Sequence, residues 1–213
     1  DVSGSILGFM GPDSATDNDD FESYSGVVEF TGAANEKQYL TLQLTNDDIV
    51  EYDEKLYVTL NDIQYSGTGN ISFQGAEFSI LDDDQAGISI SDAIQSEGGT
   101  ISFEVTLDHE ASKPISVTAS LQMGTTDSAD FVDLSDVTVY FYPGERSKTI
   151  TYTLTDDSVV EGDEQFQVIL SDARFNGETD ESRVIILNDT GTGTLSDNDA
   201  ATLSIDDVTV NEE

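Results

Sequence analysis

The residues of this sequence that could do chemistry are aspartates and glutamates gathered in a few short stretches. In the second half of the chain they form four groups, at Glu97, Asp127 and Asp130, 156–164, and Asp197 and Asp199. Calcium binds six to eight oxygen ligands, which proteins supply largely as carboxylates. Crowded carboxylates repel one another unless cations lie between them. The acidic groups therefore predict a cation site, with several ions where about ten carboxylates meet.

The overall charge leads to the same expectation. The chain has 44 Asp and Glu against seven Lys and Arg, a formal net charge of −37, and such self-repulsion destabilises a compact state. Nucleic acids and anionic membrane surfaces are excluded as partners, because both require clustered basic residues. No apolar run is long enough to insert into a membrane, and any export signal is expected outside the sequence. Cysteine is absent, which excludes disulfides and thiolate metal sites.

An internal repeat organises these acids. Residues Thr45–Asp62 match Thr155–Asp172, and 36–44 match 146–154 with the same spacing of 110 residues. Further along, 81–92 match 196–207 at a spacing of 115, so the second copy carries five extra residues. We therefore expect an N-terminally incomplete repeat at 1–84, a complete repeat at 86–199, and the first strand of a third repeat at 200–213.

The elements that must position the acids are β-strands. Apolar and polar residues alternate with a period of two in 39–44, 101–107 and 149–154, and Pro143-Gly144-Glu145 marks a turn. Short strands separated by turns predict an all-β, antiparallel sandwich. Alternate turns of such a sandwich lie at the same end, so the acidic groups can meet at one tip although they are distant in sequence.

The second copy also resembles a known family. Asp156 to Leu170 reads D-D-x-x-x-E-G-D-E-x-F-x-V-x-L, which is similar to the signature of Calx-beta domains. Further similarities are Ser96-Glu97-Gly98, Ser128-Ala129-Asp130-Phe131, the hairpin 141–145 and Ser196-Asp197-Asn198-Asp199. The resemblance covers nearly the whole chain. It implies tandem seven-stranded, immunoglobulin-like sandwiches, each complete domain holding several Ca2+ ions at one end, with the first copy lacking its opening strands.

The resemblance also implies the ligands. In the second copy they are Glu97, Asp130, Asp156, Asp157, Glu161, Glu164, Asp197 and Asp199. In the first copy they are Asp20, Asp47, Glu51, Glu54, Asp82, Asp83 and Asp84. Three positions depart from the pattern: Tyr52 replaces the Gly of E-G-D-E, Asn46 replaces an Asp, and Asn198 interrupts the last acidic group.

Catalysis has little support in the sequence. Paired carboxylates can act as acid and base, but no nucleophile and base are arranged together, and each acidic pair is better explained as an ion site. His109 is the only histidine, and its position in Asp108-His109-Glu110 between expected strands indicates a turn residue. We therefore expect a protein that is not an enzyme.

The favoured function is a calcium-binding structural or adhesive repeat of a secreted, extracellular or cell-surface protein, with Ca2+ stabilising the fold and stiffening the junctions between neighbouring repeats. One alternative is a calcium-sensing regulatory domain of a transporter or receptor. Another is a salt-adapted acidic accessory region of a secreted enzyme, without specific ion sites. A further expectation concerns Ala201–Val210, which has the sequence of an opening strand and could complete the first copy of another chain by strand addition.

Overall fold

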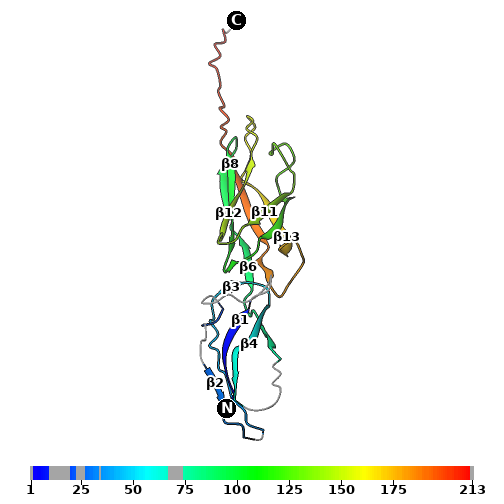
Figure 1. The fold of residues 1–213 in the computed structure, drawn as a ribbon. Helices are drawn as coiled ribbons and strands as arrows, with labels where there is room; N and C mark the ends of the chain where they lie inside the picture. Colours follow the sequence, from blue (N-terminus) through cyan, green and yellow to red (C-terminus); the bar gives the residue numbers. More distant parts are fainter. Residues whose placement is uncertain (1, 10–19, 23–26, 34, 67–73, 212–213) are drawn as a thin grey trace. The chain divides into compact units, whose positions relative to one another are not determined.

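The structure is a computed structural model that describes residues 2–9, 20–22, 27–33, 35–66 and 74–211. Regular structure in these residues consists of β-strands, with no helix (Figure 1). The chain divides into two compact units, Asp1–Asp84 (unit 1) and Gln85–Glu213 (unit 2). The all-β fold class expected from the period-two alternation is confirmed.

Unit 2 consists of two sheets. The first has the strand order β11-β10-β13-β15-β7 and comprises β7 (Ala93–Ser96), β10 (Ile115–Met123), β11 (Val137–Phe141), β13 (Glu164–Phe175) and β15 (Thr190–Ser196). The second has the order β12-β8-β6-β14 and comprises β6 (Ala86–Ile90), β8 (Thr100–Leu107), β12 (Ser147–Thr153) and β14 (Val184–Asn188). A two-residue strand, β9 (Glu110–Ala111), lies between β8 and β10 in sequence.

The first and last strands of unit 2 each pass from one sheet to the other. The stretch β6–β7 begins in the second sheet and ends in the first, and β14–β15 does the same. With each stretch taken as one strand and β9 set aside, unit 2 is the expected seven-stranded sandwich. These two stretches run parallel to each other, with β6 paired to β14 and β7 paired to β15, whereas the other strand pairs of the two sheets of unit 2 are antiparallel. The chain therefore enters unit 2 at one end of the sandwich and leaves it at the other.

The core of unit 2 forms because alternate side chains of each strand point inward. Along β8 the odd-numbered residues from Ile101 to Leu107 are buried, and their neighbours are more exposed. Phe166 of β13 lies at the centre. Its ring meets those of Phe103, Phe131 and Tyr152 edge-on, at centroid distances of 5.8, 4.9 and 6.5 Å. These contacts join both sheets, and edge-to-face packing adds to the burial of apolar surface.

Unit 1 contains β1 (Val2–Phe9), β2 (Val27–Phe30), β3 (Ile49–Val50), β4 (Glu54–Tyr65) and β5 (Ala76–Ile80). Four of these form an antiparallel sheet in the order β2-β1-β4-β5, with β1 beside β4 in Figure 1. Through the repeat spacing these strands correspond to β11, β10, β13 and β15. The first sheet of unit 2 is thus reproduced in unit 1 except for a strand equivalent to β7.

The core of unit 1 uses the same positions as that of unit 2. Phe21 and Leu56 are buried, and they pack with Leu42, Val58 and Ile80. Their equivalents in unit 2 are Phe131, Phe166, Tyr152, Val168 and Leu195. The isolated bridge between Phe21 and Leu44 likewise matches that between Phe131 and Leu154.

The strand expected at 39–44 is not formed, so this prediction is wrong. Of these residues only Leu44 forms a bridge, and Tyr39 is 87% exposed. In unit 2 the equivalent strand β12 pairs with β8, and the described part of unit 1 contains no equivalent of β8. The alternating sequence therefore has no partner with which to form a ladder.

The strand expected at the C-terminal end is also not formed. Residues 200–211 contain no strand, and all their side chains are exposed. An opening strand of a third repeat at 200–213 therefore remains a prediction, and residues 212–213 lie outside the described part of the chain.

Candidate metal centre

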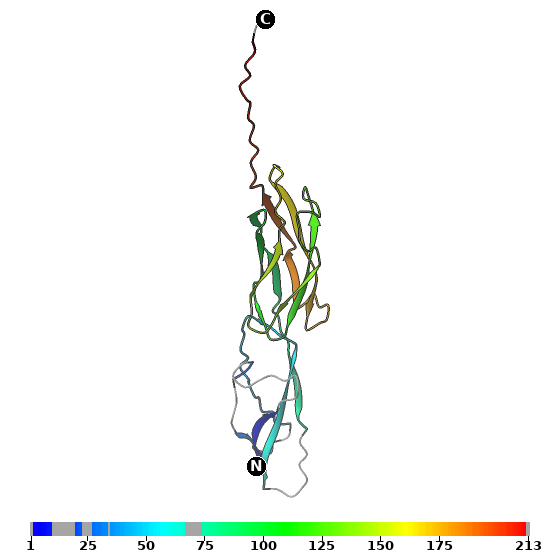
Figure 2. The same cartoon turned by 90° about the horizontal axis from the view of Figure 1, so that it is seen from above.

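The topology of unit 2 brings four acidic segments to one end of the sandwich. Glu97 follows β7 directly, and Asp197 follows β15, which runs parallel to β7. The segment 156–163 precedes β13, which runs antiparallel to β15, and Asp127 and Asp130 follow β10, which runs antiparallel to β13. All four segments therefore lie where β15 leads into the C-terminal segment (Figure 2).

Six of the predicted ligands in unit 2 form two groups of three. In each group, one carboxylate oxygen per residue lies within 4.8 Å of the others; the groups are Glu97, Asp197 and Asp199, and Asp130, Glu161 and Glu164. The two groups are connected, because the Glu161 backbone N–H donates to Asp197 Oδ2 at 3.1 Å. The oxygens are close enough to share cations.

Asp156 and Asp157, the remaining predicted ligands of unit 2, lie beside these groups. Asn198 Nδ2 donates to Asp156 Oδ1 and to the Glu97 carbonyl, both at 3.3 Å. Asp157 Oδ1 accepts a hydrogen bond from the Val159 N–H at 2.7 Å, which fixes the start of the segment 156–163. The residue that interrupts the acidic triplet, Asn198, thus connects two of the acidic segments.

The electrostatics of this end are unfavourable in the absence of a cation. Burial raises the pKa of Glu97, and repulsion from Asp197, Asp157, Asp199 and Glu161 raises it further. For Glu164, the pKa is raised by burial and then by Asp130 and Glu161. The pKa values of Glu161 and Asp199 are raised by the same two causes. A cation between these groups would oppose each of the repulsions.

Two local features show that the site fits a cation bound by oxygen. Asp199 Oδ2 is buried and has no hydrogen-bond partner among the described residues, which is costly for a carboxylate oxygen. Gly98 has a φ of +69°, and a Cβ there would lie 2.8 Å from Asp156 Cβ and Oδ1. Glycine therefore permits both the turn after Glu97 and the close approach of Asp156. A donor set of carboxylates suits calcium or magnesium better than softer metals.

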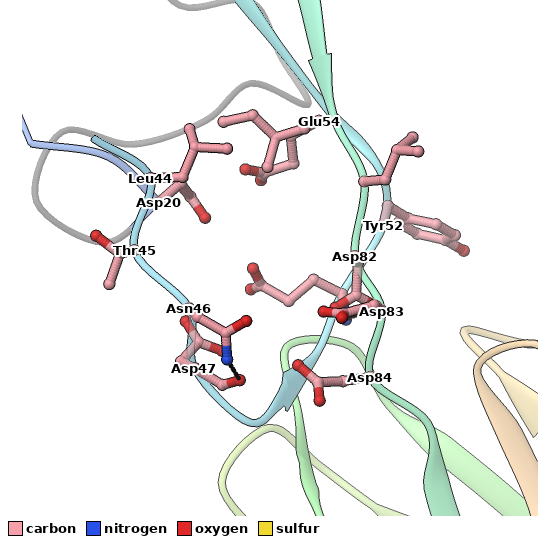
Figure 3. Close-up of a pocket in the computed structure, with 13 residues that line it drawn as sticks. Asp20, Leu44, Thr45, Asn46, Asp47, Tyr52, Glu54, Asp82, Asp83 and Asp84 are labelled. Carbon is pink, nitrogen blue, oxygen red and sulfur yellow. Dashed lines mark hydrogen bonds between the residues drawn. The ribbon is translucent and has the colours of Figure 1, made fainter. Parts of the chain in front are cut away.

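Unit 1 has an equivalent acidic cavity of about 160 Å³ (Figure 3). It is lined by all seven predicted ligands of the first copy, namely Asp20, Asp47, Glu51, Glu54, Asp82, Asp83 and Asp84. Carboxylate oxygens of Asp20, Glu51 and Glu54 lie within 4.8 Å of one another.

Contacts within the cavity join distant parts of unit 1. The Glu51 N–H donates to Asp82 Oδ2 at 3.1 Å. Burial raises the pKa of Asp84, as does repulsion from Asp82, Asp83, Asp48 and Asp47. In Figure 3 the side chain of Tyr52 points away from the carboxylates of Asp20 and Glu54. Replacement of the family glycine by Tyr52 therefore leaves the interior of the cavity acidic.

Two acids outside the predicted ligand sets belong to these clusters. The Asp127 N–H donates to Asp130 Oδ2 at 2.6 Å, and the charge of Asp127 contributes to the raised pKa values of Glu161 and Glu164. The position of Asp127 three residues before Asp130 was a sequence signal that it belongs to the same cluster. Asp48 contributes to the raised pKa of Asp84, but its equivalent is Ser158, so comparison of the copies gives no signal for it.

His109 lies outside these clusters. Its Nδ1 is 2.9 Å from Asp108 Oδ1, and Asp108 also accepts from the Gly87 N–H. Its contact with the turn agrees with the role expected from the sequence.

Comparison with known proteins identifies the family. The Calx-beta domain family matches residues 11–93 and 82–191. The two matches overlap at 82–93, which includes the three aspartates at the end of unit 1. No helix among the described residues is long and apolar enough to cross a membrane.

Two curated relatives are an adhesion receptor and an ion exchanger. Adhesion G-protein coupled receptor V1 of Danio rerio is 30% identical over 186 residues, which is 83% of this chain and 3% of the receptor. Sodium/calcium exchanger 1 of Mus musculus is 30% identical over 95 residues, 45% of this chain and 9% of the exchanger. The chain thus spans a small part of either relative.

Two similar solved structures are those of Calx domains. The apo-form Calx CBD1 domain has a TM-score of 0.48 and 23% identity, and the match covers 55% of this chain and all of that one. CBD12 from CALX1.2 has a TM-score of 0.46 and 18% identity, covering 92% of this chain and 87% of that one. A third similar structure is that of the calcium binding domain CBD12 of CALX1.1, with a TM-score of 0.43 and 18% identity, covering 90% of this chain and 86% of that one. On the match over 11–93 and 82–191, the chain belongs to the Calx-beta domain family, as tandem domains.

Proposed function

We propose that the chain is a calcium-binding structural repeat module of an extracellular or cell-surface protein. The observation that carries the proposal is the convergence of acids from four segments at one end of unit 2. The proposed ligands are Glu97, Asp130, Asp156, Asp157, Glu161, Glu164, Asp197 and Asp199, with Asp127 as a further member. The number of charges gathered there supports several ions in the complete domain.

Bound calcium would supply positive charge and coordination where the chain has repulsion. The Asp199 Oδ2 atom would gain a partner, and the protons favoured by the raised pKa of Glu97 would no longer be needed for neutrality. Because the unfolded chain does not assemble this site, calcium binding adds to folding stability by mass action. Calcium is thus proposed to act as a component of the fold.

In unit 1 the proposed ligands are the seven acids of the cavity in Figure 3. Asp82, Asp83 and Asp84 among them are the last residues of unit 1, and Gln85 begins unit 2. Calcium held by these three aspartates would restrain the chain at the point where the next domain starts. We propose that this restraint stiffens the junction between neighbouring repeats, which we assign to 1–84, 86–199 and 200–213.

The calcium supply that such sites need supports the proposed extracellular setting. Sites that remain filled as part of the fold need calcium near millimolar concentration, and extracellular modules bind in that range. Similarity to a protein named as an adhesion receptor supports an adhesive or projecting role. We also propose that copies of the chain associate by strand addition through unit 1.

Calorimetric titration with calcium, combined with melting in calcium and in chelator, tests the metal sites. We expect heat of binding at more than one equivalent per chain and a higher melting temperature in calcium. Glu97→Gln with Asp199→Asn should reduce both effects. The matched control is Glu104→Gln on the exposed face of β8, which removes charge away from the cluster. Equal binding by all variants would reject the assigned ligands, and no binding by the unaltered chain would favour a salt-adapted surface.

The affinity separates the structural role from a regulatory one. Constitutive structural sites should bind with dissociation constants of about 10⁻⁴ to 10⁻³ M, whereas sensors bind at about 10⁻⁷ to 10⁻⁵ M. The matched region of sodium/calcium exchanger 1 makes a regulatory module the second candidate. Sites filled well below micromolar calcium would favour that alternative.

A further inference from the structure

The acidic clusters of the two units exchange residue types at two equivalent positions. Six predicted ligands of unit 2 match an identical acid in unit 1: Asp130 matches Asp20, Asp157 matches Asp47, Glu161 matches Glu51, Glu164 matches Glu54, Asp197 matches Asp82 and Asp199 matches Asp84. The two exchanged positions behave differently. Asp156 corresponds to Asn46, whereas Asn198 corresponds to Asp83. At this pair of positions each unit therefore has one carboxylate and one amide.

In unit 2 the two exchanged residues are in contact. Asn198 Nδ2 donates hydrogen bonds to Asp156 Oδ1 and to the Glu97 carbonyl oxygen, both at 3.3 Å. A carboxylate and a carbonyl oxygen only accept hydrogen bonds, so the amide must present its nitrogen to them. Asp156 also lies against Gly98, because a Cβ at Gly98 would be 2.8 Å from Asp156 Oδ1. Asp156 is therefore held in place from two sides.

In unit 1 the same pair of positions lies in the acidic cavity. Asn46 and Asp83 both line it, and Figure 3 shows them on different segments of the chain. Here the amide belongs to the segment before β4, where Asn46 Nδ2 donates to the Asp47 carbonyl oxygen at 3.0 Å. The carboxylate belongs to the last acidic triplet. The arrangement is the reverse of that in unit 2, and the number of carboxylates at the pair is the same.

An amide and a second carboxylate would have different effects at position 198. Repulsion is already present there, because the pKa of Asp199 is raised by burial and further by the charges of Asp197, Asp156 and Asp157. A carboxylate at position 198 would add to this repulsion in the metal-free protein, whereas the Asn198 amide adds no charge and donates to Asp156. A calcium ion, by contrast, is bound more tightly as its ligands bring more negative charge. The amide therefore stabilises the metal-free domain and lowers its calcium affinity.

We propose that this Asp–Asn pair determines both the calcium affinity of a domain and its stability without calcium. The inference rests on the proposed calcium-binding function and assigns residues that tune it. Asn198 is a positioning residue, because it touches Asp156 and Glu97 and is not among the proposed ligands. Since the two units hold the pair in opposite orientations, the feature that matters is one amide together with one carboxylate. The segment that provides the carboxylate matters less.

Reversal of the pair in unit 2 of the full chain tests the proposal. Three variants are compared with the parent chain: Asn198→Asp, Asp156→Asn, and a double variant with both substitutions. The double variant keeps the net charge of the parent and reproduces the arrangement of unit 1. Urea unfolding in chelator measures the metal-free stability, and calorimetric titration measures the calcium affinity. Unit 1 is unchanged in all variants, so the differences report on unit 2.

The matched control is Gln167→Glu on the exposed face of β13. Like Asn198→Asp, it converts an amide into a carboxylate and adds one negative charge. Gln167 pairs with Gln122 on one side and with Thr192 on the other, so the new charge lies among uncharged neighbours.

The two single variants should differ from the parent in different ways. Asn198→Asp should unfold at a lower urea concentration in chelator and bind calcium about tenfold more tightly. Asp156→Asn should keep at least the parent's midpoint in chelator and bind calcium about tenfold more weakly. The double variant should return to the parent in both measurements, because the loss caused by Asn198→Asp in chelator requires the charge of Asp156. Gln167→Glu should change neither measurement by a comparable amount.

Three results would overturn the proposal. The first is an equal loss of metal-free stability from Asn198→Asp with and without Asp156→Asn, since the two residues would then not act as a pair. The second is a double variant that binds calcium as weakly as Asp156→Asn, because the carboxylate would then be required at position 156. The third is binding by Gln167→Glu that is as tight as that by Asn198→Asp, which would make the effect one of net charge. A parent chain that binds no calcium would refute the proposed function and the affinity role of the pair, and the measurements in chelator distinguish that failure from a lack of coupling within the pair.

Discussion

Replacement of Gly98 by alanine should lower both the stability and the calcium affinity of unit 2, whereas a similarly strained glycine replacement elsewhere in the unit should lower only the stability. The backbone at Gly98 has a φ of +69°, and the added Cβ would lie 2.8 Å from Asp156 Cβ and Oδ1. Gly144 in the same unit is the matched control. It has a φ of +80°, and a Cβ there meets no atom within 4 Å. Both variants strain the backbone, but only Gly98→Ala forces the Asp156 carboxylate out of its place.

The expected magnitudes follow from the backbone strain, which both variants share, and from the displacement of Asp156, which only Gly98→Ala causes. A non-glycine residue in the left-handed region costs about 1–2 kcal/mol, so both variants should lose about this much stability in chelator. Displacing Asp156 removes one proposed ligand, and a tenfold loss of affinity corresponds to about 1.4 kcal/mol. At a calcium concentration of 100 times the original dissociation constant, the gain in stability should fall from about 2.7 to about 1.4 kcal/mol. The Gly144→Ala control should keep the full gain.

Urea unfolding in chelator and in calcium measures both quantities for the two variants. Equal losses in chelator together with a smaller calcium gain for Gly98→Ala are expected. If Gly98→Ala kept the same calcium gain as the control, Asp156 would not be a ligand, or it would bind from a displaced position. Either result would refute the reasoning that places Gly98 in the site because of its missing side chain.

Three further predictions concern pH and the core. The folded-state pKa values of Glu97 and Glu164 are raised above the ordinary 4.5, so their favourable contribution to metal-free stability is fully present below that value and is lost as pH rises through the raised pKa values. The melting temperature in chelator should therefore rise from pH 7 towards pH 5. A melting temperature that does not change with pH would count against the repulsion between these carboxylates. Phe166→Ala should cost about 3–5 kcal/mol in urea unfolding, against less than about 0.5 kcal/mol for the exposed Tyr140→Ala. Gly193→Ala places a Cβ 2.4 Å from the Phe166 ring and should cost about 1–3 kcal/mol; adding Phe166→Leu should recover part of this loss, and no recovery would mean that the clash lies elsewhere.

The strands are predicted from the sequence more completely in unit 2 than in unit 1, for a physical reason. In unit 2 each alternating segment has a partner, and local pattern and tertiary pairing agree at every strand. In unit 1 the segment 39–44 has the same alternation, but the described residues of unit 1 contain no equivalent of β8 beside it. A strand is stabilised by its neighbours more than by its own residues. Period-two patterning therefore indicates that a segment can form a strand, while the presence of a partner decides whether it does.

For the candidate site, the grouping of the acids in short stretches between strands was the effective signal. It places Glu97, Asp130 and Asp199 in separate turns, and the strand directions then bring those turns to one end. Asp48 illustrates what a repeat cannot indicate, because its equivalent Ser158 carries no charge and its position depends on the shape of one cavity. The sequence also did not indicate the connecting role of Asn198. A residue that interrupts an acidic triplet suggests the loss of a ligand, but the Asn198 amide donates to Asp156 and to the Glu97 carbonyl.

The parallel pairing of β7 with β15 has a mechanical consequence. The chain enters unit 2 through β6–β7 and leaves through β15, so tension applied along the polypeptide pulls these two strands in opposite directions along their length. The backbone hydrogen bonds between them, over the register from Ala93↔Gly193 to Ser96↔Ser196, are then loaded together in shear and cannot open one at a time from an end. Force-resisting stability of this kind is governed by the rate of unfolding. A module built in this way can carry load along a string of repeats.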